Sequence, residues 1–149
     1  MLNKDNRLNK PSADTKPHAR NVWTCTGEIT NTITKKTYPL ETDFVARDYG
    51  MQYGITIAGR DPEIPGMSSA LRILFNESQP PSATYPIGRE GMYVEYGREY
   101  HESYYSAADG ELKLINLADK KWLEGDLTMN TNENSGDQYT IKAKFTLQQ

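Results

Sequence analysis

The chain of 149 residues contains one cysteine, two histidines and no long apolar run. The single cysteine, Cys25, cannot form an intramolecular disulfide, and we expect it to be an inert buried thiol. No apolar run approaches the roughly 18 residues that a membrane-spanning helix requires, so we expect no transmembrane segment. A chain of this length can bury about 68–70% of the surface that its unfolded form exposes. It therefore needs neither a disulfide framework nor a structural metal.

Neither sign of charge dominates the sequence. There are 17 lysines and arginines and 20 aspartates and glutamates, for a net charge of -3. A domain with this balance is not expected to bind nucleic acid. Residues 1–20 differ from the rest, because they carry a net charge of +3, two prolines and almost no large apolar side chain. We predict a disordered N-terminal tail there, followed by a single β domain over residues 21–149.

A helical stripe of apolar residues is also missing. Apolar side chains instead recur at every second position, which is the period of a half-buried strand. The alternation is clearest over residues 139–147 and also marks residues 21–29 and 51–57. Less regular strands fit residues 37–47 and 70–76.

Turn signals separate these runs at short intervals, and alternating strands favour an antiparallel sheet with one face on a core. We predict an all-β antiparallel sandwich of about eight to nine strands, with residues 91–147 as a continuous meander. A calycin-like closed barrel is the alternative. At most one turn of helix is expected, near Met67–Leu71.

The turns of the C-terminal half suggest strand registers. Gly97-Arg98 suits a type II′ hairpin and Asp109-Gly110 a type I′ hairpin, and a loop over 118–121 would pair Leu117 with Trp122. These registers assign an ordinary core to one face: Met92, Val94, Tyr96, Tyr105, Leu112, Leu114, Leu127 and Met129.

The opposite face is unusually aromatic and aliphatic, with carboxylates at its edges: Tyr93, Glu95, Tyr100, Glu102, Tyr104, Ile115, Leu117, Trp122 and Glu124. A soluble monomer seldom leaves such a patch bare. A loop over residues 78–90, the tail or a second copy of the chain could cover it. As a recognition surface it would use rigid aromatic side chains and directional acceptors. The predicted binding residues are Tyr93, Glu95, Tyr100, Glu102, Tyr104, Trp122 and Glu124.

We favour a protein partner or a homodimer contact for this surface, with carbohydrate as the closest alternative. Catalysis is not expected, because His18 lies in the predicted tail and His101 near a hairpin end, so a Ser/His/Asp triad is improbable. Paired carboxylates among Glu95, Glu102 and Glu124 keep a carbohydrate-active alternative open. A barrel carrying a small apolar ligand is the second alternative.

No cofactor or metal is expected either. Residues 130–137 depart from a calcium loop in the place of their glycine, and Ile141 stands where the closing carboxylate should be. The sequence has no zinc-like spacing of Cys and His and no glycine-rich phosphate loop. We therefore predict a non-enzymatic binding module.

Three C-terminal segments carry a resemblance: residues 110–117, residues 122–129 and residues 139–147. Together they resemble the closing strands of small uncharacterised all-β bacterial envelope lipoproteins, over about the last quarter of the chain. The resemblance implies a secreted, periplasmic or envelope setting in preference to the cytoplasm, and it brings no active-site residue. It does not extend to a lipid-attachment cysteine near the start, since Cys25 falls within an expected strand.

Overall fold

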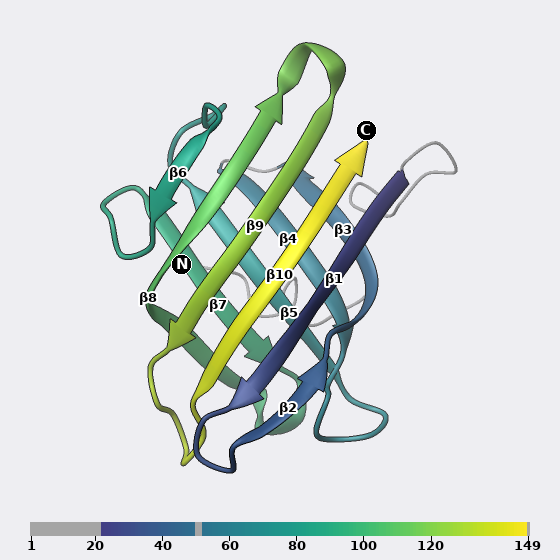
Figure 1. The fold of residues 1–149 in the computed structure, drawn as a ribbon, viewed down its shortest axis with the longest axis vertical. Coiled ribbons are helices and arrows are strands. Elements are labelled where there is room, and N and C mark those ends of the chain that lie inside the picture. Colours follow the sequence, from purple (N-terminus) through teal and green to yellow (C-terminus); the bar gives the residue numbers. More distant parts are fainter. Residues whose placement is uncertain (1–21, 50–51, 149) are drawn as a thin grey trace.

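The computed structural model describes residues 22–49 and 52–148, which are built almost entirely of strands (Figure 1). The predicted tail lies outside these residues. The elements in chain order are β1 (Val22–Asn31), β2 (Lys36–Pro39), β3 (Glu41–Tyr49), β4 (Tyr53–Arg60), β5 (Ser68–Phe75), β6 (Ala83–Pro86), β7 (Met92–Arg98), the 3₁₀ turn η1 (Tyr100–Glu102), β8 (Ser103–Leu117), the 3₁₀ turn η2 (Ala118–Lys120), β9 (Trp122–Thr131) and β10 (Tyr139–Gln148). Within this part of the chain, no helix is long and apolar enough to cross a membrane.

The ten strands form one antiparallel sheet in the order β2-β1-β10-β9-β8-β7-β5-β4-β3, and β6 pairs separately with β8. β1 pairs along its whole length with β10, so the first and last strands are neighbours. β3 approaches β1 across the remaining seam, where the Leu40 amide donates a hydrogen bond to the Gly27 carbonyl at 3.0 Å. The predicted all-β antiparallel fold is therefore confirmed, and it takes the form of a nearly closed barrel, the alternative prediction, with ten strands in place of eight or nine.

The barrel is flattened into two layers. Figure 1 shows β8, β9, β10 and β1 crossing in front of β3, β4, β5 and β7. The apolar core fills the space between the layers. The consecutive pairing of β7, β8, β9 and β10 confirms the predicted C-terminal meander.

Two of the three predicted turns are wrong. Gly97 lies inside β7, and the chain turns at η1, so Tyr96 pairs with Tyr105. Asp109-Gly110 lies inside β8. A Cβ on Gly110 would stand 2.1 Å from the Thr128 carbonyl oxygen, and its φ is +132°. Glycine is therefore required there by close strand packing and not by a hairpin. At most one helical turn was expected near Met67, and the described residues have none there because β5 begins at Ser68.

The predicted core face is nevertheless confirmed in full. Shifting the turn after β7 moves the register by an even number of residues, which leaves every side chain on its original face. A register shift between Ala107 and Asp109 then reverses the alternation along β8, as the predicted hairpin would have done. All eight side chains are buried: Met92, Val94, Tyr96, Tyr105, Leu112, Leu114, Leu127 and Met129. The pairing of Leu117 with Trp122 is confirmed as well.

Leu114 and Ile115 test this assignment of faces, because they are adjacent in β8 and point in opposite directions. Leu114 is buried in the core, whereas Ile115 is 43% exposed. We expect Leu114→Ala to lower the free energy of unfolding by about 2–5 kcal/mol through cavity formation, and Ile115→Ala by less than about 1 kcal/mol. Urea denaturation of both variants measures the two costs. Equal or reversed costs would contradict the register.

Candidate functional site

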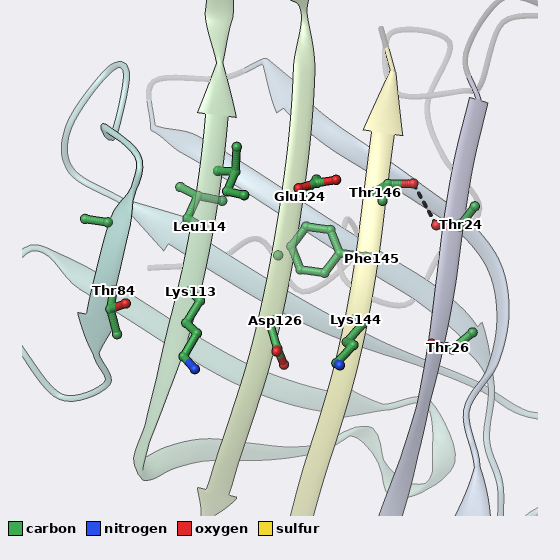
Figure 2. A pocket seen from close by; sticks show the side chains of 13 residues that line it. Thr24, Thr26, Thr84, Lys113, Leu114, Glu124, Asp126, Lys144, Phe145 and Thr146 are labelled. Carbon is green, nitrogen blue, oxygen red and sulfur yellow. Dashed lines mark hydrogen bonds between the residues drawn. The ribbon is translucent and has the colours of Figure 1, made fainter.

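The outward side of the front layer carries an unusual mixture of charged, small and apolar side chains. We call it the front face; it consists of the outward side chains of β8, β9, β10 and β1. One row across it runs through Lys113, Asp126, Lys144 and Thr26. The next row runs through Ile115, Glu124, Thr146 and Thr24. Figure 2 shows these side chains spread over neighbouring strands, with β6 at one margin.

An open groove of about 510 Å³ lies on the front face. Its lining consists of Thr24, Thr26, Ala83, Thr84, Lys113, Leu114, Ile115, Glu124, Gly125, Asp126, Lys144, Phe145 and Thr146. A second groove, of about 600 Å³, shares Thr26, Asp126 and Lys144 with the first. The two grooves therefore form one continuous depression across β9, β10 and β1.

Gly125 lies among the residues that line this depression. A Cβ on Gly125 would lie 2.1 Å from Cζ of Phe145, because the phenyl ring occupies the space where a side chain would stand. Gly125 and Phe145 are paired residues of β9 and β10, and both are buried. The backbone at this point is therefore held close to the ring.

The charges that flank the depression are available to a partner. Within residues 22–49 and 52–148, no hydrogen bond or ion pair engages the side-chain charges of Glu124, Asp126 or Lys144. Lys113 has only a long contact of 3.9 Å, from its Nζ to Oε1 of Glu111. Positive and negative groups alternate along the Lys113–Asp126–Lys144 row, so a partner with the complementary alternation would fit it.

An apolar border adjoins the depression near η2. Ile115 and Leu117 are 43% and 37% exposed, and Trp122, which pairs with Leu117, is half-buried. Val22 is 62% exposed and lies in the same row, beyond Gln148. Three of these four apolar side chains are contiguous, which makes the border a candidate contact centre.

The seven predicted binding residues are divided between different parts of the barrel. Trp122 and Glu124 lie on the front face. Three others, Tyr93, Glu95 and Tyr104, lie on the outward side of the back layer, because they alternate with the core residues Val94, Tyr96 and Tyr105. Tyr100 and Glu102 belong to η1. The aromatic band expected on one face is therefore split by the curvature of the sheet.

A buried polar cluster, which the sequence did not suggest, closes one end of the barrel. The Arg98 guanidinium donates from Nε to Oδ2 of Asp61 at 2.6 Å and from Nη2 to Oδ1 at 3.0 Å. Its Nη1 donates to the Tyr139 hydroxyl at 2.8 Å, and that hydroxyl donates to Oε1 of Glu63 at 2.6 Å. The loop after β4 is thereby tied to β7 and β10. The sequence feature that could have revealed this cluster is an arginine at a core-facing position of a strand. It was missed because Gly97-Arg98 was predicted to be a turn and not part of a strand.

Asn31 extends the cluster to the end of β1. Its Nδ2 donates to Oε2 of Glu63 and to Oδ1 of Asp137, both at 3.0 Å. The cluster has three carboxylates and one guanidinium, since Asp61, Glu63 and Asp137 all lie near Arg98. Even so, no group of three His, Cys, Asp or Glu residues in the described chain could hold a metal ion. The cluster is a structural latch, since a bidentate arginine fixes both distance and orientation.

Two side chains of kinds common in catalysis, Cys25 and His101, lie among the described residues. Burial raises the pKa of the Cys25 thiol, although a hydrogen bond with Thr42 opposes this shift. A thiol with a raised pKa is a poor nucleophile. His101 is exposed in η1 and packs against the Tyr100 ring at a centroid distance of 4.0 Å. Comparisons with protein-family models, curated proteins and solved structures find no match to this chain.

The latch predicts a loss of stability at high pH. Burial and the hydrogen bond to Glu63 raise the pKa of Tyr139 well above its ordinary value near 10. Above pH 10 the unfolded state therefore binds fewer protons than the folded state, and the free energy of unfolding falls by up to about 1.4 kcal/mol per pH unit for this one group.

We expect Tyr139→Phe to flatten this fall between about pH 10 and 11, even though it also removes hydrogen bonds. Burial raises the pKa of Tyr96 too, so part of the slope should remain. Urea denaturation at several pH values measures the slope, and Tyr38→Phe, outside the latch, is the control. An unchanged slope in Tyr139→Phe would show that Tyr139 ionises equally in both states.

Proposed function

We propose that the protein is a non-enzymatic binding module that recognises a protein partner through its front face. The observation that carries this proposal is the contiguity of a partly exposed apolar border, Ile115, Leu117 and Trp122, with a groove flanked by charges that have no close partner among the described residues. Protein interfaces combine an apolar centre containing large aromatic side chains with a polar, charged rim. The front face has both parts side by side.

The charge pattern favours a protein over a carbohydrate. A neutral sugar needs hydrogen-bond acceptors and aromatic faces to stack on, but Trp122 is the single aromatic residue of the apolar border, and two aliphatic side chains surround it. The charges in the row of Lys113, Asp126 and Lys144 alternate in sign. A polypeptide whose own charges alternate with the opposite signs could pair with all three.

The packing of the barrel argues against a small apolar ligand inside it. Tyr96, Tyr105 and Tyr139 are fully buried and contact one another with ring centroids 5.1–6.2 Å apart. These rings occupy the interior close to the latch. Recognition on the outer surface is therefore the better-supported mode.

A capture experiment with matched variants tests the proposal. Trp122→Ala and Leu117→Ser remove the apolar border, whereas Ile33→Ser removes an apolar side chain that is 52% exposed in the β1–β2 turn. We expect each border variant to bind the protein captured by the wild type at least about tenfold more weakly, equivalent to about 1.4 kcal/mol of binding free energy. Ile33→Ser should bind it as the wild type does. Thermal unfolding of each variant checks that the fold is intact.

Two results would overturn the proposal. Equal capture by all variants would place the contact elsewhere on the molecule. Binding to a polysaccharide array that Trp122→Ala abolishes, with no protein captured, would assign the front face to carbohydrate. A loss of self-association in the border variants, measured by sedimentation, would identify the partner as a second copy.

A further inference from the structure

The centre of the outward side of the back layer is buried, although it faces away from the core. We call it the back face; it consists of the outward side chains of β3, β4, β5 and β7. Six side chains on it are buried: Ala46, Thr56, Ala70, Arg72, Leu74 and Glu95. The matching positions of the front face are half-buried or exposed. Something must therefore cover the back face.

The described residues do not supply this cover. The close backbone approaches between their strands lie within the sheet and across the seam, so none of these approaches places a strand over the back face. The loop over 61–67 packs at the latch, where Asp61 accepts from Arg98. Asn116 at the end of β8 holds the loop over 76–82 through Gln79 and Pro80. Of the residues outside the described part of the chain, only the segment 1–21 is long enough to cross the back face. The other two gaps are residues 50–51 and residue 149.

We propose that the N-terminal segment, residues 1–21, docks across the back face and covers it. The segment precedes β1, and β1 lies beside β3 across the seam. It therefore enters at the β3 edge of the back face. Crossing four strands requires about 15 Å, whereas 21 extended residues reach about 70 Å.

The chemistry of the back face suits a basic polypeptide. Glu95 is 3% exposed and accepts a hydrogen bond from the Tyr93 hydroxyl at 3.0 Å. Asp48 accepts from Nη2 of Arg72 at 2.6 Å. These two carboxylates and one guanidinium leave one negative charge in excess, and residues 1–20 carry a net charge of +3. Tyr93 and Glu95 both have further interactions.

Arg72 supplies a separate argument for a peptide. It is 8% exposed, and within the described part of the chain its Nε and Nη1 have no hydrogen-bond acceptor. A buried N–H without an acceptor is costly. Backbone carbonyls of a covering segment would satisfy both donors. The small outward residues around Arg72, which include Ala46, Gly54, Thr56, Ala70 and Gly97, let a backbone approach closely.

Photo-crosslinking in the full chain tests the docking. Tyr93→benzoylphenylalanine places the crosslinker at the margin of the back face, where Tyr93 is partly exposed, and Ile115→benzoylphenylalanine places it on the front face as a control. We expect an intramolecular crosslink from position 93, and none from position 115, to a peptide within residues 1–21. No crosslink from position 93 to that segment would overturn the proposal. A crosslink between isotopically distinct copies would do so too, because a second copy would then be the cover.

A variant in the segment itself leaves the barrel sequence untouched. Leu2→Ser with Leu8→Ser removes both leucines of the segment. We expect trypsin to cleave after Arg7 about fivefold faster or more in this variant, because cleavage tracks the undocked population. The same rate in both proteins would overturn the proposal.

Discussion

Every other part of the sheet depends on the way β8 pairs. Its first residues pair with β7 in the back layer, and its later residues pair with β9 and β6 in the front layer. One strand therefore carries the chain from one layer to the other. The register shift between Ala107 and Asp109 keeps the side chains of both halves directed at the same core. Without that shift, either Tyr105 or the pair Leu112 and Leu114 would face outward.

The interior is organised by aromatic packing that ends in the latch. Tyr96, Tyr105 and Tyr139 pack edge to face or tilted. The Tyr139 hydroxyl, at the polar end of this cluster, lies between Arg98 and Glu63. Arg98 and Asp61 form a buried ion pair. Removing either of them would leave the other charge buried and unpaired, which costs far more than a surface ion pair contributes. The latch therefore holds the loop after β4 in one position against β7 and β10.

The two outer faces have different physical characters. The front face has an open groove, charges of both signs and an apolar border. The back face has a central surface of small residues and a buried ion pair between Arg72 and Asp48. These differences support an external partner on the front and a segment of the same chain on the back. The two proposals use separate residues, so one can fail without the other.

The sequence by itself determined which side chains point inward. Alternation with period two is a local property. The assignment of inward side chains therefore stayed correct although two turns were predicted wrongly. The error after β7 shifted the register by an even number of residues, and the bulge in β8 reversed the alternation as the predicted hairpin at Asp109-Gly110 would have done. It also determined the tight β8–β9 connection, since Leu117 pairs with Trp122. The sequence could not tell a turn glycine from one required by close packing, as at Gly97 and Gly110, and so it missed the inward Arg98. Only the tertiary structure decided that Tyr93 and Trp122 lie on different faces. The reason is that the directions of the outer faces depend on sheet curvature and on the pairing of β1 with β10, a contact between the two ends of the chain that no local pattern encodes.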